Sequence, residues 1–396
     1  MKRIGVIGVG SGGILSLCHF LTWLNDYQVV SIYDPNIPCI GIGESTNPFF
    51  LDTMSNAMGI DDFGPFLHER IMDSTIKHGT IFRDWREKEY LNPLFGDNKN
   101  IGIHFNTFKF KDFAFDSLKS KWGEKFQEIV GQVLEIQNNP DNIILNIDGK
   151  YHSFDYVIDC RGFPKTYENH VLLDMPINRG FINNSTEGND WGYTLHQATE
   201  NGWMFGVPLS TRTSYGYLFN DSITNVEDAK KDFSDRIGVP IDKVVETDYK
   251  FKSFYIKQLI KNRLIINGNS AFFLEPMVAN SLFIYDYVNR LTYDYIVNGF
   301  DANESNYNFQ QMALQMHDLI CYYYHGGSKY DTDFWKYAVQ YSSKRLKESL
   351  FFLQLKDRFR YMEENNCEIN SYSFYSVDSL KKIDKNMEYY YWTKKE

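Results

Sequence analysis

Three glycines near the start of the chain have the spacing that binds phosphate groups. Gly8, Gly10 and Gly13 form the pattern G-x-G-x-x-G between two apolar segments. In a turn between a strand and a helix, these glycines let backbone N–H groups approach a pyrophosphate, and the helix N-terminus favours its negative charge. Asp34, after the next apolar run, is placed to accept hydrogen bonds from ribose hydroxyls, although Pro35 beside it is equally typical of a turn. The spacing predicts a dinucleotide site.

The elements that must hold this loop follow from the periodicity of the apolar residues. Residues 3–8 predict a short buried strand, residues 14–24 an apolar helix, and residues 29–33 a second strand. A strand, glycine loop, helix and strand in this order form the βαβ unit of a Rossmann-like fold.

The rest of the chain contains several further predicted elements. We expect mixed helix and loop over 44–86, a helix over 113–121, a hairpin of 129–136 with 143–147, a strand over 156–160, a second sheet from 191–220 and 244–266, and helices after residue 281.

The predicted fold class is α/β, with domains that are discontinuous in sequence. We expect a Rossmann-like dinucleotide-binding lobe from 1–165 and 260–300, an inserted β-sheet substrate lobe over 166–259, and a helical C-terminal region over 301–396.

Composition and charge exclude several classes of protein. Apolar residues make up 43% of the 396 residues, which predicts a globular chain. The net charge of −10 and the absence of a basic cluster argue against nucleic-acid partners, and no uncharged run predicts a membrane helix. Five widely spaced cysteines without a CxxC pair favour a reducing, cytoplasmic location and no structural metal. His317 and His325 are expected to be structural.

Several further motifs, in order along the chain, resemble those of the flavin-dependent halogenases of the tryptophan halogenase family. The matching segments are GIGESTNP at 41–48, IKHG at 76–79, FRDW at 82–85, HFN at 104–106, DCRGF at 159–163, WMFGVP at 203–208, GNSAFFLEP at 268–276, and His325 followed by YDTDFW at 330–335. Each segment alone is a weak signal, whereas the ordered set is specific.

The resemblance implies FAD as the dinucleotide, gives the Rossmann-like lobe the FAD monooxygenase-type fold, and assigns residues to FAD binding. Reduced FAD would come from a separate flavin reductase and react with O₂, and a halide ion would then be oxidised to hypohalous acid. The cofactor-binding residues implied are Gly8, Gly10, Ser11, Gly13, Asp34, Gly43, Glu44, Ser45, Pro48, Val133, Asn269 and Pro276.

The resemblance also implies the roles of the catalytic and halide-binding residues. Lys77 would receive hypohalous acid and direct it, which requires that burial lower its pKa. The alternative for Lys77 is an exposed, structural lysine. Backbone N–H groups at Asn280 and Ser281 would hold the halide. Trp203, Phe205 and Pro208 would separate the flavin from the substrate, or simply form strand core.

Two departures from the family pattern change the expected chemistry. Asn269 stands where the family usually has Asp, and Val278 stands where tryptophan halogenases have a catalytic glutamate. Because a phenol stabilises its own ring cation, the missing glutamate favours a phenolic or similarly electron-rich aromatic substrate.

Two other functions remain open from the sequence. One is an FAD-dependent aromatic monooxygenase in which Lys77 is structural, and the other is a flavin-binding protein without catalytic activity. A homo-oligomer is also compatible with the sequence.

Overall fold

The computed structural model describes residues 1–39, 41–42, 44–94, 99–365, 377–389 and 391. The chain divides into two compact units, each built from three segments. The first unit comprises Met1–Ser74, Phe105–Leu173 and Lys252–Leu314, and the second comprises Thr75–His104, Asp174–Phe251 and Gln315–Glu396.

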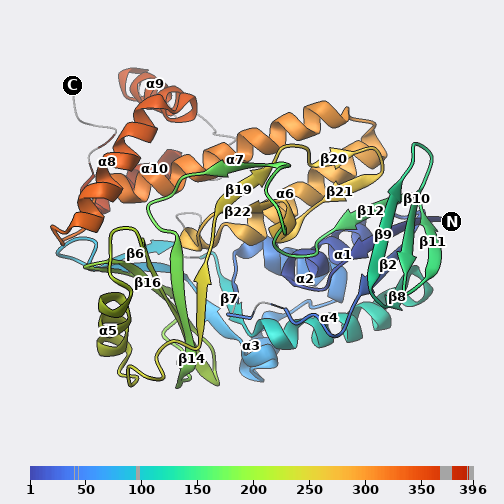
Figure 1. Cartoon of the computed structure of the whole chain (residues 1–396), viewed down its shortest axis with the longest axis horizontal. Helices are drawn as coiled ribbons and strands as arrows, with labels where there is room; N and C mark the ends of the chain where they lie inside the picture. The colour runs from blue at the N-terminus through green and yellow to red at the C-terminus, as the bar shows by residue number, and fades with distance from the viewer. Residues whose placement is uncertain (40, 43, 95–98, 366–376, 390, 392–396) are drawn as a thin grey trace. The chain divides into compact units, whose positions relative to one another are not determined.

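A parallel sheet forms the centre of the first unit (Figure 1). Its strand order is β20-β21-β12-β1-β2-β8, and every neighbouring pair is parallel except β20 with β21. The strands are β1 (Lys2–Ile7), β2 (Tyr27–Tyr33), β8 (Phe126–Val130), β12 (Tyr156–Asp159), β20 (Ile260–Lys261) and β21 (Leu264–Ile266). With helix α1 (Ser11–Trp23) between β1 and β2, the predicted Rossmann-like βαβ unit is confirmed.

Four further helices belong to the first unit: α2 (Pro48–Met58), α3 (Phe63–His68), α4 (Thr107–Trp122) and α6 (Ser281–Tyr293). Helix α4 begins six residues before the predicted start at residue 113. The reason is Asn106, whose side-chain oxygen caps the helix by accepting from the amide of Phe108 at 3.1 Å.

Two small antiparallel sheets complete the first unit. One contains β9 (Val133–Asn138), β10 (Ile143–Ile147) and β11 (Lys150–Phe154), and the other contains β13 (His170–Leu173), β19 (Ser253–Ile256) and β22 (Phe272–Phe273). The predicted strand over 129–136 is wrong in one respect, because it is two strands, β8 and β9. Strand β8 ends just before Gly131, whose φ of 158° a larger residue rarely adopts.

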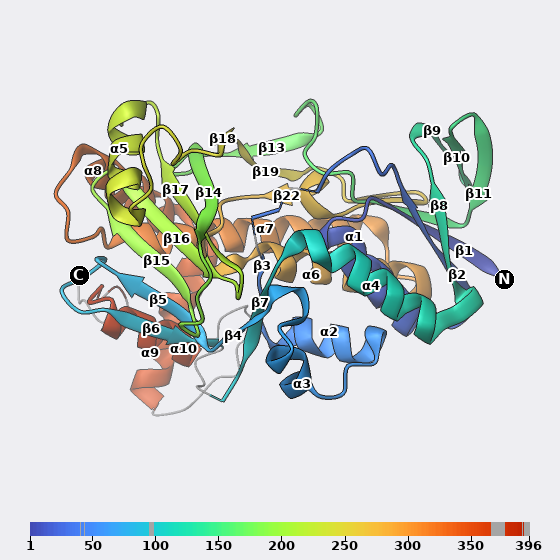
Figure 2. The same ribbon diagram turned by 90° about the horizontal axis from the view of Figure 1, so that it is seen from below.

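The second unit is built on a seven-stranded sheet. Its order is β18-β14-β17-β16-β15-β5-β6, in which only β5 with β15 is a parallel pair. The strands are β5 (Gly79–Arg83), β6 (Tyr90–Pro93), β14 (Arg179–Glu187), β15 (Thr194–Thr199), β16 (Gly202–Pro208), β17 (Arg212–Phe219) and β18 (Thr247–Lys250). Helix α5 (Val226–Ile237) covers one face and buries Ala229 and Phe233 against it (Figure 2).

The sequence assigned all of 244–266 to this sheet, and that assignment is wrong beyond β18. Strand β21 instead lies parallel to β12 in the first unit, with Val157 opposite Leu264. Residues 75–104 were expected in the Rossmann-like lobe as part of 1–165, but they belong to the second unit, because β5 pairs with β15, with Thr80 opposite Thr194.

Four helices follow near the C-terminus: α7 (Ala302–His325), α8 (Asp333–Glu348), α9 (Leu350–Asn365) and α10 (Val377–Asn386). Within the described part of the chain, none of the helices combines the length and apolar character needed to cross a membrane.

Candidate active site

Lys77 is a buried residue at the end of a short strand, β4 (Thr75–Lys77), in the second unit. The strand pairs with β7 (Gly102–Phe105), with Lys77 opposite Gly102. Only 3% of Lys77 is exposed, and burial lowers its pKa from 10.5 to about 7. The structure therefore excludes an exposed lysine, which the sequence left open as the alternative.

Hydrogen bonds anchor β4, the strand of Lys77, to the aromatic motif at 203–208. The Thr75 hydroxyl donates to the carbonyl of Pro208 at 2.7 Å and lies 3.0 Å from Nδ1 of His104. Because that hydroxyl has one hydrogen, it must accept from Nδ1–H. Nε2 of His104 is then the acceptor, and it receives the hydroxyl of Thr194 at 2.9 Å.

His104 is therefore held neutral in one tautomer. Burial and, secondarily, the charge of Lys77 hold its pKa well below the usual range. The segments around Lys77, His104 and Pro208 matched separate motifs in the sequence, and the structure brings them together within the second unit.

The two aromatic residues of the 203–208 motif lie on β16. Trp203 is fully buried and donates from Nε1 to the hydroxyl of Tyr324 at 2.8 Å. Phe205 is 5% exposed, and its ring centroid lies 6.2 Å from that of Trp203. Both residues are thus part of a rigid strand that is tied to the lysine strand at Pro208.

Sequence analysis missed His196, which lies on β15 in the same unit. It is 2% exposed and its ring centroid lies 4.8 Å from that of Trp203. The signal in the sequence is weak, because a single histidine in an alternating strand is most often a core residue. Burial and the nearby charge of Lys77 lower the pKa of His196 to about 3, so its ring is neutral.

In the first unit, the glycine loop has the shape required for a pyrophosphate. A Cβ atom on Gly13 would lie 2.0 Å from the carbonyl oxygen of Gly8, so the helix packs directly on the turn. A Cβ on Gly10 would meet no atom within 4 Å, which leaves open space at the N-terminus of α1. Gly10 is the N-cap and no side chain caps this helix. The free amides and this space fit the phosphates of FAD.

The segment at 41–48 is fixed against this loop. The Ser11 hydroxyl donates to Oε1 of Glu44 at 2.7 Å, which joins two residues that the sequence assigned separately to FAD binding. Burial raises the pKa of Glu44, while the bond from Ser11 lowers it. Ser45 follows Glu44 in β3 (Glu44–Ser45), and Pro48 is the first residue of α2. Gly43 lies outside the described residues.

The second flavin motif lies against α1 and α6. A Cβ on Gly12 would be 2.9 Å from the Cα of Gly268, so the two glycine segments are in close contact. Asn269, which replaces the usual Asp, accepts a hydrogen bond at 2.5 Å from the hydroxyl of Tyr285 on α6. Its amide oxygen therefore already has a partner within the protein.

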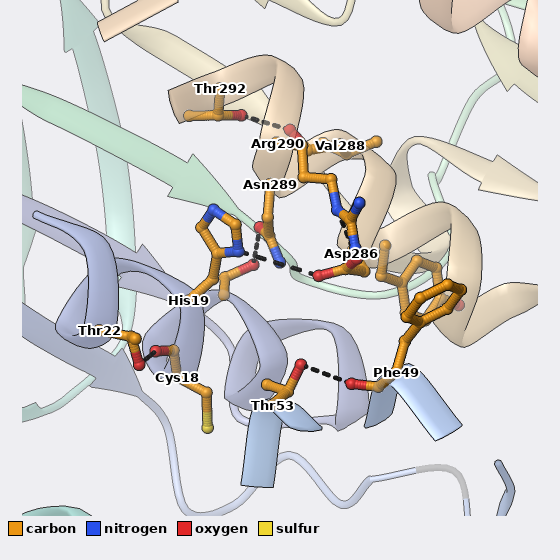
Figure 3. Close-up of polar contacts among 12 residues, drawn as sticks. Cys18, His19, Thr22, Phe49, Thr53, Asp286, Val288, Asn289, Arg290 and Thr292 are labelled. Atoms are coloured by element: carbon orange, nitrogen blue, oxygen red, sulfur yellow. Dashed lines mark hydrogen bonds and ion pairs between the residues drawn. The ribbon is translucent and has the colours of Figure 1, made fainter. Parts of the chain in front are cut away.

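Buried polar contacts hold α1 against α6. The Ser16 hydroxyl donates to Oδ1 of Asn289 at 2.8 Å, and Nδ2 of Asn267 donates to the same oxygen at 3.0 Å. Figure 3 shows Asn289 beside His19, whose Nδ1 lies 3.8 Å from a carboxylate oxygen of Asp286. This network fixes the first glycine segment relative to the second one.

The segment assigned to the halide leads into the N-terminus of α6. Pro276 precedes the single turn η5 (Met277–Ala279), and Ser281 is the first residue of α6. Nδ2 of Asn280 donates to the carbonyls of Glu275 and Met277 at 3.2 and 3.1 Å, which folds this segment back on itself. The contact of the Asn280 and Ser281 amides with a halide stays a prediction.

Two other residues assigned to the cofactor have local structural partners. Oδ1 of Asp34 accepts from both the amide and the side chain of Asn36, at 2.9 Å each, so Asp34 also forms the turn that Pro35 suggested. Val133 starts β9 and packs against the core of the first unit. Their contact with FAD stays a prediction.

The first unit belongs to the class of Rossmann-like dinucleotide-binding folds, with its glycine loop at the carboxyl end of β1. The profile of the tryptophan halogenase family matches residues 3–139 and 96–379. The chain therefore belongs to the tryptophan halogenase family, and it is a flavin-dependent enzyme with FAD as cofactor and a halide ion as co-substrate.

Individual relatives are distant in sequence. Tryptophan 6-halogenase ThaL of Streptomyces albogriseolus is 20% identical over 419 residues, which cover 85% of this chain and 78% of the relative. Tryptophan 6-halogenase SttH of Streptomyces toxytricini is 23% identical over 261 residues, covering 59% of this chain and 48% of the relative.

Solved structures share the fold. A tryptophan halogenase from Shewanella frigidimarina superposes with a TM-score of 0.79 at 19% identity, over 98% of this chain and 89% of that one. A flavin-dependent halogenase from Xanthomonas campestris gives a TM-score of 0.71 at 16% identity, over 87% and 83% of the two chains. The predicted α/β fold class is confirmed.

Proposed function

We propose that this chain halogenates an electron-rich, phenolic aromatic compound, using reduced FAD delivered by a separate flavin reductase. The observation that carries the proposal is Lys77, a lysine at the family's motif position that is buried and has a pKa lowered to about 7. A lysine with this pKa is present near neutral pH as both ammonium and free amine. It is therefore suited to bind hypohalous acid and to exchange a proton with it.

Bound reduced FAD, with O₂ and halide, supplies the hypohalous acid. The glycine loop and Glu44 hold the cofactor, and the amides of Asn280 and Ser281 hold the halide, since backbone N–H groups bind an anion without adding a mobile charge. Trp203 and Phe205 exclude water and separate the cofactor from the organic substrate. Their burial on β16, which is anchored through Pro208, supports this role.

The substrate class follows from the residues around Val278. The relatives named above act on tryptophan according to their names. By the resemblance of the 268–281 segment to the family motif, Val278 stands at the position of the catalytic glutamate of tryptophan halogenases. Without that carboxylate, the ring cation must be stabilised by the substrate itself. A phenolic oxygen provides this stabilisation, so we favour a phenol over free tryptophan.

The experiment combines the protein with FAD, a flavin reductase, NADH, O₂ and bromide, and offers a panel of phenols together with tryptophan. We expect a brominated phenol that forms only with bromide present. Lys77→Ala should lose product while it still binds FAD, and Lys150→Ala, at an exposed position of β11, is the matched control. An oxygenated product formed without halide would instead indicate a monooxygenase, and bromination that survives in Lys77→Ala would disprove the role of the lysine.

A further inference from the structure

His196 and His104 are two buried histidines of the second unit, and they differ in how their ring nitrogens are satisfied. Both are close enough to Lys77 for its charge to act on them. The two nitrogens of His104 are bound by Thr75 and Thr194 at 3.0 and 2.9 Å. Nδ1 of His196 is buried and has no hydrogen-bond partner among the described residues.

The surroundings of His196 are aromatic and rigid. On β15 it stands opposite Phe82 of β5 and Phe205 of β16. Its ring centroid lies 5.3 Å from that of Phe82, in an edge-to-face arrangement, and 4.8 Å from that of Trp203. A phenylalanine of similar shape would fill this position without leaving a polar atom unsatisfied.

A buried polar atom without a partner lowers stability, and native proteins keep few of them. The imidazole of His196 therefore indicates a role other than packing, whereas both ring nitrogens of His104 have partners within the protein. His196 packs against Trp203 and lies close enough to Lys77 for the lysine charge to act on it, and the proposed function assigns these two residues to the separation of cofactor from substrate and to hypohalous acid. A substrate that donates a hydrogen bond would satisfy the unpartnered nitrogen of His196.

We propose that Nδ1 of His196 binds the hydroxyl group of the phenolic substrate and accepts its proton while the ring is halogenated. This inference rests on the proposed function and adds to it the residue that selects for a phenolic O–H. It makes His196 a catalytic residue that contacts the substrate directly.

The step balances as follows. The ring carbon forms a bond to the halogen, the halogen–oxygen bond of hypohalous acid breaks, and the leaving hydroxide takes a proton from the ammonium of Lys77 to become water. The phenolic proton passes to His196, which gives a neutral dienone. The dienone then tautomerises: its ring proton passes to water while the carbonyl oxygen takes a proton from water, which restores the aromatic phenol, and His196 returns its proton to the amine of Lys77. The sum is phenol plus hypohalous acid giving halophenol plus water.

The weak basicity of His196 is compatible with this step. With a pKa of about 3, the imidazole does not remove a proton from a resting phenol. As the ring carbon attacks, however, the phenolic oxygen gains positive charge and its proton becomes strongly acidic. The imidazole is then basic enough, and because its ring starts neutral, it is always ready to accept the proton.

The test compares 2-naphthol with its methyl ether, which has no proton to donate. For each enzyme, kcat/KM for bromination of the naphthol is divided by that for the ether, and the ratio is compared with that for free hypobromous acid in buffer. We expect the wild-type ratio to exceed the free-acid ratio by about 10- to 100-fold, the range expected for one specific hydrogen bond.

Two substitutions separate hydrogen bonding from packing. His196→Phe keeps the ring and should lower the ratio to the free-acid value, whereas His196→Asn keeps an acceptor near the place of Nδ1 and should retain most of the selectivity. His196→Leu is the second apolar variant if the Phe variant does not fold, as judged by melting temperature and FAD binding.

The outcomes separate this inference from the proposed function. A wild-type ratio equal to that of free acid, or an undiminished ratio in an apolar variant that folds, would overturn the role of His196 alone. If the wild-type enzyme brominates neither probe nor any other phenol, the proposed function fails, and this inference fails with it.

Discussion

Replacing Lys77 by methionine should stabilise the protein while removing its activity. Methionine has nearly the same length and no charge, so it can occupy the buried position at the end of β4 without the penalty of burying an ammonium. Stability and function then change in opposite directions, as is expected where a functional residue is costly to bury.

The size of the gain follows from the pKa of Lys77, which burial lowers from 10.5 to about 7. Between these values the unfolded chain binds more protons than the folded chain, so stability rises with pH in this window. The penalty is about 5 kcal/mol at acidic pH, about 4 kcal/mol at pH 7 and about 2 kcal/mol near pH 9, and it vanishes above 10.5. Lys77→Met should gain these amounts.

The assay is urea unfolding of the protein without FAD, followed by tryptophan fluorescence at several values between about pH 7 and pH 9. The quantity of interest is the difference in the free energy of unfolding between Lys77→Met and the wild type. The difference cancels the titrating groups that do not interact with Lys77, and His104 and His196, which do, are neutral throughout this pH range. Lys150→Met, at an exposed position, is the control and should show no such pH-dependent gain.

Two results would refute this reasoning. If Lys77→Met is less stable than the wild type at pH 7, the lysine is held by contacts that outweigh its desolvation. If the gain is the same at both ends of the pH range, the stabilisation does not come from the loss of a titrating group.

Three further predictions concern other parts of the chain. Gly10→Ala should keep the fold, because its Cβ meets nothing within 4 Å, but it should weaken FAD binding by about tenfold or more. Gly13→Ala should lower the melting temperature as well, since its Cβ would lie 2.0 Å from the Gly8 carbonyl. FAD titration and melting curves distinguish the two variants, and normal FAD affinity in Gly10→Ala would contradict the role of the glycine loop in phosphate binding. Burial opposes the charge of His317, but its thiol and acidic neighbours raise its pKa to about 10. The charged ring therefore contributes fully to protein stability below pH 6.5, and this contribution is lost as pH rises through about 10. The stability lost in His317→Phe should shrink over that window, and a constant loss would refute this. Ala279 has a φ of 51°, so Ala279→Gly should raise stability by about 1 kcal/mol in thermal melting, and a lower melting temperature would show that its methyl group matters more than its backbone.

The Rossmann-like part of the fold was predictable because its sequence signals are local. Gly8 has a φ of 97° and Gly13 lies against the turn, so these positions require glycine whatever surrounds them. The alternating Ile and Val residues of β1 and β2 are buried on both faces of a parallel sheet and produce short apolar runs.

The strand containing Lys77 was not predicted because its pattern of burial is inverted. In β4 the polar residues Thr75 and Lys77 are buried, while Ile76 between them is partly exposed. An alternating apolar pattern identifies the buried face of a strand only when that face is apolar. The polar residues that this strand buries therefore conceal it in the sequence.

His196 and its neighbours could not be recognised from the sequence for a different reason. His196 is 119 positions from Lys77 in the chain. Lys77 lies on β4, which pairs with β7, and His196 comes near it through the parallel pairing of β15 with β5, the strand that begins two residues after Lys77. Sheet order is a non-local property, and nothing within the 194–199 segment indicates which strand lies beside it.

The buried lysine also explains why the second unit has so many fixed polar contacts. A penalty of about 4 kcal/mol at pH 7 is a large share of the 5 to 15 kcal/mol that stabilises a typical domain. Removing either threonine beside His104 would leave a buried ring nitrogen unsatisfied and add about 1 to 3 kcal/mol to that burden. Thr75 anchors β4 to Pro208, and the two threonines together satisfy both ring nitrogens of His104, so the lysine can stay buried in a unit that remains folded. On this view the hydrogen-bonded histidine stabilises the site, and the unpartnered one, His196, is free to act on the substrate.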